Sequence, residues 1–207
     1  MGIVSITPSV PIILASASKI REEILKNTGL LFSIKTSDVN EDELKKKLLN
    51  KSIQEEAKIL ACAKASNISQ NHPNEYIVGA DQICSLNDKI YSKPITMDNA
   101  IQQLTDLSGK THKQTSAVCL YYKNELIWSY VEEALLTMHE LNTFEITSYL
   151  ELDKPLNSCG SYKYESLGCH LFSKVVGQSE TIQGLPIIPL LAQLRKNKLY
   201  SLINKIV

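Results

Sequence analysis

The segment from Pro11 to Arg21 constrains the fold most, because it joins an apolar strand directly to the start of a helix. The run Pro11-Ile-Ile-Leu-Ala15 shows no polar alternation, which is typical of a strand that is covered on both faces. The sequence Ser16-Ala-Ser18-Lys-Ile-Arg21 follows at once and begins with residues that favour helix starts. A buried strand that turns straight into a helix is typical of α/β proteins.

The rest of the chain continues this alternation. Apolar residues at helical spacing predict helices over residues 18–28, 53–70, 97–107, 143–152 and 185–196. Runs rich in β-formers predict strands over residues 11–15, 31–36, 76–80, 115–122 and 126–136, and a hairpin that pairs 83–84 with 89–91. Because helices and strands alternate first and an antiparallel pair follows, we expect a single α/β domain over residues 1–207 with a mixed sheet and no separate linker.

Local signals mark several of the helix ends. Ser52-Ile-Gln-Glu55 is a capping box, and Asn142 is a good N-cap for the helix that follows it. Gly29 and Gly109 come directly after predicted helices, where a left-handed residue commonly ends a helix. These signals set boundaries that do not depend on distant parts of the chain.

The charge balance points to a small partner. The 207 residues contain 22 Lys and Arg against 22 Asp and Glu, so the net charge is zero. A chain without net charge has no overall field that would attract nucleic acid or a membrane surface. With 43% hydrophobic residues the chain can still bury a full core. We therefore expect a globular protein that acts on a small molecule.

The cysteines, histidines and apolar runs argue against a disulfide framework, a zinc site and a membrane span. The five cysteines are odd in number and form no C-x-x-C pair, which favours reduced, structural thiols. The four histidines match no zinc spacing, so a metal held by carboxylates is favoured over zinc. No run reaches the ~18 apolar residues of a membrane span, and the N-terminus has no signal-peptide pattern. These features predict a cytoplasmic protein.

The helix start after the first strand is a candidate phosphate site. Unpaired N–H groups and the helix dipole favour an anion there. Ser16 and Ser18 add hydroxyl donors, and Arg21 adds a planar fork that suits phosphate oxygens. The alternative is structural, with serine as an ordinary N-cap and Arg21 in solvent.

Asp81 and Lys64 are charged residues inside apolar patterns. Asp81 directly follows Ile77-Val-Gly-Ala80, so we expect its carboxylate at the carboxyl end of a buried strand, where open α/β sheets bind ligands. The alternative is an aspartate that caps a turn. Lys64 falls on the alanine-rich stripe of its helix, so its ammonium must reach an anion or extend to solvent.

Two further residues complete a set. Lys93 precedes Pro94 and projects from a stiff extended segment. Glu41 follows the second predicted strand and could equally be a first-turn helix residue. Two carboxylates for Mg²⁺ or Mn²⁺, with three cations to meet phosphate charge, are what metal-assisted attack of water on a phosphoanhydride requires.

The order of motifs resembles the Maf family of nucleoside triphosphate pyrophosphatases. The resemblance runs from about Ile12 to Leu194. It is carried by these motifs: Ser16-x-Ser18-x-x-Arg21, Asp38-x-x-Glu41, Gly79-Ala-Asp81-Gln82, Lys93-Pro94, Leu107-Ser-Gly-Lys-Thr-His112, Gly160-Ser-Tyr162 and Gly184-Leu-Pro186.

The resemblance implies a fold and an activity. The implied fold has two lobes around an elongated mixed sheet, with the site in a cleft between them and a homodimer as the usual assembly. The implied reaction cuts between the α and β phosphates with a divalent cation, Mg²⁺ or Mn²⁺. By resemblance Asp81 is the proton acceptor, Lys64 and Lys93 are catalytic, Ser16, Ser18 and Arg21 bind phosphate, and Glu41 and Asp81 hold the metal.

Three positions bear on the substrate. Gln82 and Glu165 resemble the branch that hydrolyses 7-methyl-GTP and so clears a modified nucleotide from the pool. The carboxylate of Glu165 could accept from the N–H donors of a guanine edge, and its charge suits a cationic methylated ring. Ile20 departs from this branch, which is expected to have tryptophan there. The alternatives are a dTTP/UTP pyrophosphatase of the same family and a non-catalytic nucleotide-binding regulator of septum formation.

Three other positions depart from the family pattern. Lys19 stands where proline is usual, and Glu22 stands where a second basic residue is common. Asn40 replaces an aspartate of the family's Asp-Glu pair, which lowers the expected metal affinity.

Overall fold

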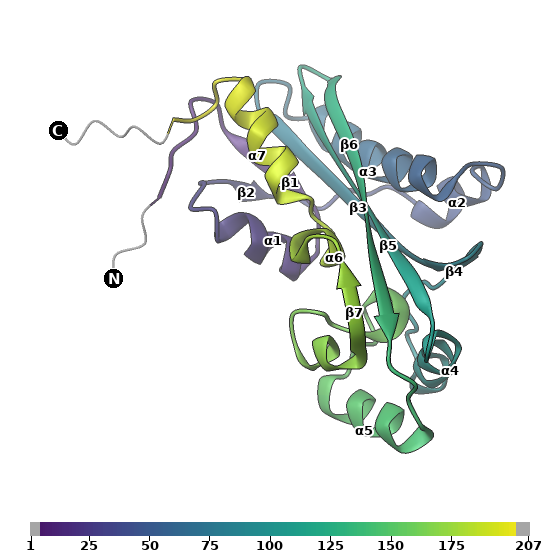
Figure 1. Ribbon diagram of the computed structural model, residues 1–207. Coiled ribbons are helices and arrows are strands. Elements are labelled where there is room, and N and C mark those ends of the chain that lie inside the picture. Colours follow the sequence, from purple (N-terminus) through teal and green to yellow (C-terminus); the bar gives the residue numbers. More distant parts are fainter. Residues whose placement is uncertain (1–4, 202–207) are drawn as a thin grey trace. The chain divides into compact units, whose positions relative to one another are not determined.

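A computed structural model describes residues 5–201 and shows a mixed α/β fold (Figure 1). The strands are β1 (Ile12–Ala15), β2 (Ser33–Ile34), β3 (Tyr76–Leu86), β4 (Lys89–Ile90), β5 (Thr111–Tyr122), β6 (Glu125–Met138) and β7 (Phe172–Val176). The α-helices are α1 (Lys19–Lys26), α2 (Glu41–Lys46), α3 (Ile53–Ser69), α4 (Met97–Leu107), α5 (Thr143–Asp153), α6 (Ser179–Ile182) and α7 (Ile187–Lys196). Two 3₁₀ turns, η1 (Cys159–Ser161) and η2 (Leu167–Leu171), precede β7.

The strands form a mixed sheet in the order β2-β1-β3-β5-β6-β7, with β4 paired to β3. β1 is parallel to both β2 and β3, whereas β3–β4 and β6–β7 are antiparallel. Asn87 at the β3–β4 turn has φ 54°, as expected for a tight hairpin. The predicted α/β class, mixed sheet and hairpin are therefore confirmed.

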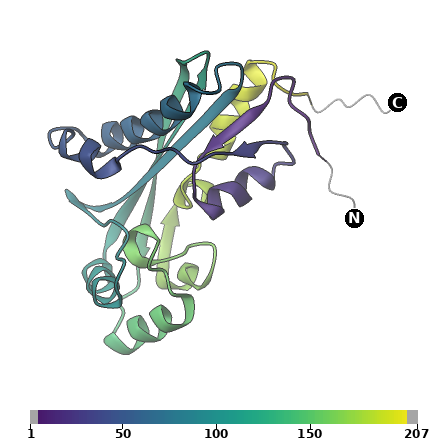
Figure 2. The same ribbon diagram turned by 180° about the vertical axis from the view of Figure 1, so that it is seen from behind.

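The described chain divides into two compact units, each with its own core. Residues 5–81, 117–131 and 184–201 form the first unit, and residues 82–116 and 132–183 form the second. In the first unit α3 lies on one face of β1 and β3 and α7 lies on the other (Figures 1 and 2). Its core joins apolar residues of β1, β3 and β5 to those of α1 and α7. The core of the second unit joins α4 and α5 to β6.

The local helix signals are confirmed. Both reciprocal hydrogen bonds of the Ser52/Glu55 capping box are present, and Asn142 makes the same kind of box with Glu145. The helix predicted over 97–107 has those bounds, and Gly29 and Gly109 have φ of 78° and 68°. Signals that act within one helical turn thus predicted helix ends well.

The strands differ more from prediction. β3 was expected to stop before Asp81, but it continues to Leu86, so Asp81 lies inside a strand and not at its carboxyl end. The reason is a change of partner, since β3 pairs with β1 over Tyr76–Gly79 and with β4 at Ser85. The strand predicted over 31–36 shrinks to Ser33–Ile34, and α7 begins two residues later than predicted.

Gly79 allows α3 to approach β3 closely. A Cβ atom at this position would lie 2.3 Å from the carbonyl oxygen of Ala61 and 2.9 Å from the Sγ of Cys119. These are distances that packed atoms do not adopt, so only glycine fits between helix and strand. The contact brings the helix that carries Lys64 against the strand that carries Asp81.

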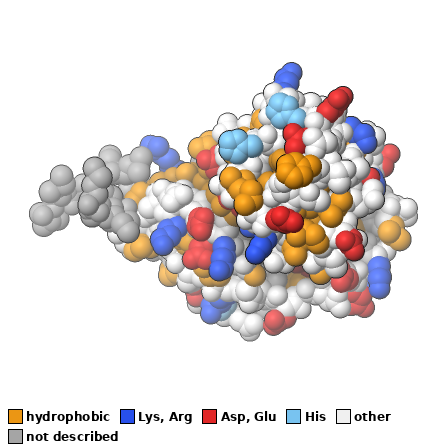
Figure 3. Space-filling model, turned by 90° about the horizontal axis from the view of Figure 1, so that it is seen from below, with side chains coloured by type: hydrophobic (Ala, Val, Ile, Leu, Met, Phe, Trp, Pro, Cys, Tyr) orange, Lys and Arg blue, Asp and Glu red, His pale blue; other side chains and the backbone are white. Residues whose placement is uncertain are grey.

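The surface carries charges of both signs. In the face shown in Figure 3, acidic and basic side chains are interspersed among hydrophobic and uncharged ones. Among the described residues, no helix is both long and apolar enough to cross a membrane.

Candidate active site

The central feature of the first unit is a buried ion pair between Lys64 and Asp81. The Nζ of Lys64 donates to Oδ1 of Asp81 at 2.6 Å, and the two side chains are only 11% and 9% exposed. Lys64 was expected to reach either solvent or an anion, and the structure shows that it reaches an anion. A charged group this deeply buried is retained only when it is paired, so each residue accounts for the other.

Glu41 is the second carboxylate at this ammonium. Its Oε1 lies 3.0 Å from Nζ of Lys64, and its side chain is 42% exposed. The sequence left open whether Glu41 belongs to a helix start or to a charged site. Both descriptions apply, because Glu41 is the first residue of α2 and also contacts Lys64. Asn40 caps this helix by accepting from the backbone N–H of Glu43.

Arg21 is held by backbone carbonyl groups. Its Nε donates to the carbonyl of Gly184 at 2.8 Å, and its Nη1 donates to the carbonyl of Ala80 at 3.0 Å and to Oγ of Ser16 at 3.4 Å. The alternative of an arginine that lies in solvent is therefore wrong. Within residues 5–201 the two N–H groups of Nη2 have no partner, so one side of the guanidinium remains for an anion.

The two serines behave differently from ordinary caps. Ser18 occupies the N-cap position of α1, yet its hydroxyl makes no capping hydrogen bond. The Oγ of Ser16 accepts from the backbone N–H of Ser18 at 3.2 Å. Capping of α1 therefore does not explain the hydroxyl of Ser18. Ile20, one residue into α1, packs against the first core.

Three predicted site residues belong to the second unit. The carboxamide of Gln82 donates to the carbonyl of Ile182. Lys93 is exposed and is followed by the buried Pro94. Glu165 is exposed on the segment between η1 and η2. The structure thus brings Ser16 and Arg21 together and Glu41, Lys64 and Asp81 together in the first unit, and it places Gln82, Lys93 and Glu165 in the second.

Glu56 is a carboxylate near this cluster that sequence reasoning missed. Burial raises the pKa of Glu56 above its usual value, the positive charge of Lys45 opposes the rise, and the negative charge of Asp81 adds to it. A spacing signal existed, because Glu56, Leu60 and Lys64 recur every four residues and so share a helix face.

The fit to a divalent cation can be judged from the donor set. The described residues contain no group of three or more His, Cys, Asp or Glu side chains that could hold a metal. Mg²⁺ in nucleotide sites uses only one or two carboxylates and takes its other ligands from phosphates and water. Glu41 and Asp81 already meet at one cation, the ammonium of Lys64, and so fit this requirement.

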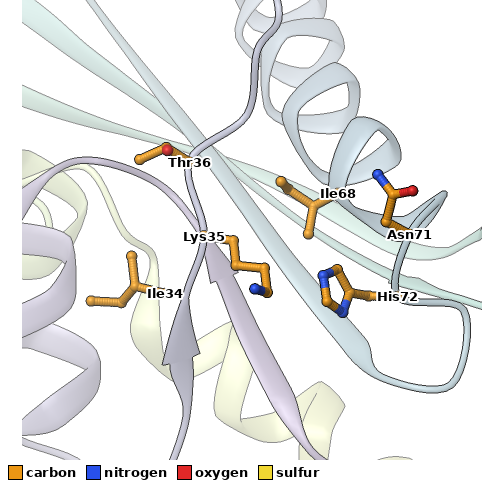
Figure 4. Close-up of a pocket in the computed structure, with 6 residues that line it drawn as sticks. All are labelled: Ile34, Lys35, Thr36, Ile68, Asn71 and His72. Carbon is orange, nitrogen blue, oxygen red and sulfur yellow. The ribbon is translucent and has the colours of Figure 1, made fainter.

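An open pocket of about 420 Å³ lies elsewhere in the first unit (Figure 4). In the close-up Lys35 extends toward His72, whose Nδ1 is 3.0 Å from Oε1 of Glu75. The pocket is lined by Ile34, Lys35, Thr36, Ile68, Asn71 and His72. None of the predicted site residues lines it, so this pocket is separate from the charged cluster.

The sequence profile of the Maf-like protein family matches residues 11–197. The chain belongs to the Maf family. The resemblance drawn from the motifs is thus confirmed, and the match covers all the predicted site residues of this Maf protein.

Two similar proteins have functional names. A protein of Legionella pneumophila (strain Corby), named nucleoside triphosphate pyrophosphatase, is 42% identical over 180 residues, which is 87% of this chain and 90% of that protein. A protein of Brucella abortus, named 7-methyl-GTP pyrophosphatase, is 40% identical over 194 residues, which is 92% of this chain and 98% of that protein.

A solved structure is more distantly similar. The nucleoside-triphosphatase / dITP/XTP pyrophosphatase from Mycobacterium abscessus aligns with a TM-score of 0.45 and 15% identity, over 94% of this chain and 99% of that one.

Proposed function

We propose that this Maf protein is a nucleoside triphosphate pyrophosphatase that cuts the α–β phosphoanhydride and acts on 7-methyl-GTP. The products are a nucleoside monophosphate and pyrophosphate. The buried pair of Asp81 and Lys64 carries the proposal, because a fold has no structural reason to bury two opposite charges inside apolar runs. The names of the Legionella and Brucella relatives support the reaction class and the substrate respectively.

Asp81 is the proposed general base. Its Oδ1 is held by Lys64, whereas Oδ2 has no hydrogen bond in the described part of the chain. Oδ2 can therefore take the proton of a water molecule whose oxygen bonds to the α-phosphorus, while the bond from that phosphorus to the bridging oxygen breaks. Lys64 fixes the direction of the carboxylate, which is the role of a charge partner in a preorganised site.

Cationic and hydroxyl groups would bind the phosphates. Nη2 of Arg21, which has no partner within residues 5–201, and the hydroxyl of Ser18, which makes no capping hydrogen bond, lie at the start of α1, where the helix dipole also favours an anion. Ser16 supports this segment from within, since its Oγ accepts from both of these residues. Lys93 would add a further positive charge. Such groups stabilise the charge that develops on the departing pyrophosphate.

Glu41 and Asp81 would hold Mg²⁺ or Mn²⁺ together with phosphate oxygens. When bound, the cation polarises the phosphate and lowers the pKa of water. The half-exposed Glu41 is the more adaptable ligand, because its carboxylate can turn from Lys64 toward a cation at the surface. Asn40, which replaces an acidic residue, caps α2 and thereby fixes where Glu41 begins the helix.

Base recognition is assigned to Glu165, with Gln82 beside the catalytic aspartate in sequence. A carboxylate accepts from two N–H donors at once, which matches a guanine edge, and its charge attracts the cationic 7-methylated ring. Uracil and thymine present a donor and acceptors instead, so an amide would serve them better. Ile20 packs against the first core and does not supply the aromatic face expected at this position.

The test is pyrophosphate release from 7-methyl-GTP, GTP, UTP and dTTP, with Mg²⁺, with Mn²⁺ and with excess chelator. We expect metal-dependent turnover that favours 7-methyl-GTP and falls by a factor of about a thousand or more in Asp81→Asn. Asp106→Asn, which alters a surface pair with Lys89, is the matched control and should retain activity.

Each alternative has its own result. A preference for UTP or dTTP would keep the reaction and overturn the substrate. Tight nucleotide binding without turnover by the folded protein would overturn the enzyme and favour a nucleotide-binding regulator. Turnover by Asp81→Asn close to that of the unmodified protein would remove Asp81 from its role.

A further inference from the structure

Asp153 is a buried carboxylate at an electrostatically unfavourable place. It is the last residue of α5, and its side chain is only 6% exposed. The carboxyl end of a helix carries partial negative charge, so an aspartate there is repelled by the helix dipole. Burial adds a desolvation cost. A carboxylate at this position therefore needs strong compensating partners.

The partners of Asp153 all lie within the second unit. Oδ2 accepts from the hydroxyl of Tyr149 at 2.9 Å, and Oδ1 accepts from the hydroxyl of Ser166 at 2.8 Å. The Nζ of Lys163 lies 3.8 Å from Oδ1 and donates to the backbone carbonyl of Asp153 at 2.5 Å. Both carboxylate oxygens are thus satisfied, and two of the three partners come from one short segment.

That segment, residues 163–168, is closed on itself and tied to α5. The backbone N–H of Lys163 donates to the hydroxyl of Tyr149 at 3.0 Å, so Tyr149 bridges the segment to Asp153. A Cβ at Gly168 would lie 2.3 Å from the carbonyl oxygen of Lys163, so the two ends are in close contact. Glu165 lies between the two anchored positions, Lys163 and Ser166.

The charge of Glu165 acts on Tyr149, one of the partners of Asp153. Burial raises the pKa of Tyr149 well above its usual value; the backbone N–H of Lys163 opposes the rise, and the charges of Asp153 and Glu165 add to it. The Tyr149 phenol therefore stays protonated and can donate to Asp153 throughout the physiological range. The hydrogen bonds of Asp153 and Tyr149 with Lys163 and Ser166 thus hold the backbone on both sides of Glu165.

We propose that Asp153, acting through Tyr149 and Ser166, is a positioning residue that fixes the carboxylate of Glu165 for base recognition. This inference rests on the proposed function, in which Glu165 reads the base. A carboxylate that must meet two N–H donors of a flat ring needs a defined direction as well as a charge. Glu165 is exposed, and the backbone that carries it sets where its side chain begins.

The decisive variant is Asp153→Asn, which keeps the shape of the side chain and removes its charge. We expect the ratio of kcat/KM for 7-methyl-GTP to that for UTP to fall about tenfold, because a charge-assisted contact is worth roughly that factor. The kcat/KM for UTP should stay within about twofold, since Asp153 touches no group proposed for catalysis. Combining Asp153→Asn with Glu165→Gln should lower the ratio no further than Glu165→Gln alone.

Hydrogen exchange provides a readout that needs no substrate. We expect the amides of residues 163–168 to exchange at least about tenfold faster in Asp153→Asn, because the Tyr149 hydroxyl, which accepts from the Lys163 amide, loses the charged acceptor that holds it in place. Ser166→Ala removes one hydrogen bond only and should give a smaller change of the same kind, so it serves if Asp153→Asn folds poorly. Asp106→Asn, on α4 of the same unit, should change neither selectivity nor exchange.

The outcomes separate the two proposals. Equal loss of kcat/KM for both nucleotides, or unchanged exchange over 163–168, would overturn the positioning role of Asp153. If Glu165→Gln by itself leaves the substrate ratio unchanged, the recognition role of Glu165 in the proposed function fails. The inference of a specificity role for Asp153 would then fall with it, while the exchange rates would still decide whether Asp153 holds the segment.

Discussion

Removal of the Lys64 ammonium tests the buried charge pair most directly. In Lys64→Met the side chain keeps most of its length and apolar volume, but Asp81 loses the partner that lies 2.6 Å away. Breaking a buried pair by removing one partner typically costs about 3–5 kcal/mol, because the remaining charge is left desolvated. The cost should be near the upper end of that range, since Asp81 is 9% exposed and Glu41 also loses its cation.

The expected loss can be compared with an exposed pair in the same helix region. Lys51 and Glu55 are 3.7 Å apart and about half exposed, so Lys51→Met should cost far less than Lys64→Met, because water screens an exposed pair. The double variant with Lys64→Met and Asp81→Asn should recover more than half of the stability lost in Lys64→Met, because no unpaired charge stays buried at Asp81.

The assay is urea unfolding followed by tryptophan fluorescence. Trp128 is the single tryptophan and packs against the core of the first unit, so its signal reports on the unit that holds the pair. A loss of about 3–5 kcal/mol corresponds to a fall in Tm on the order of 10 °C for a chain of this size. If Lys64→Met and Lys51→Met lost the same small amount, or the double variant were less stable than Lys64→Met, the account of Asp81 as a buried, cation-dependent carboxylate would be refuted.

Two further predictions concern packing and pH. Gly79→Ala should lower stability by about 3 kcal/mol or more and reduce turnover, because the new Cβ would displace α3 from β3. Gly109→Ala strains its own turn at φ 68° and crowds the side chain of Glu140, and it should leave turnover unchanged. Calorimetry measures the stability of both variants, and the pyrophosphate assay measures their turnover. Burial lowers the pKa of His112 to about 4, below its usual 6.5, so the unfolded chain binds the extra proton between these pH values. The free energy of unfolding should fall by about 3 kcal/mol as the pH drops through that window. His112→Gln should flatten this pH dependence, whereas His139→Gln, at an exposed histidine, should not. An unchanged slope in His112→Gln would contradict the conclusion that the buried His112 causes the dependence.

The sequence by itself determined the features that depend on residues within one turn of each other. The capping box at Ser52, the N-cap at Asn142 and the bounds of α4 were predicted because helix-end hydrogen bonds join residues three or four apart. The hairpin at Asn87 was predicted for the same reason, since a tight turn needs particular residues at adjacent positions. The family could also be recognised from the sequence, because its motifs follow one another in the same order along the chain.

Only the tertiary structure decided the partners of the charged groups. Lys64 meets Asp81 across 17 residues, and Arg21 donates to a carbonyl 163 residues away, so no local pattern could specify either contact. The continuity of β3 through Asp81 likewise depends on its partners in the sheet, β1 before Asp81 and β4 from Ser85 on, which no local pattern specifies. Asp153 reads in sequence as an ordinary residue at a helix end, and only the folded segment 163–168 supplies the donors that make its burial stable. Local order follows from short-range hydrogen bonds, whereas the pairing of buried charges follows from which elements the sheet and the two cores bring together.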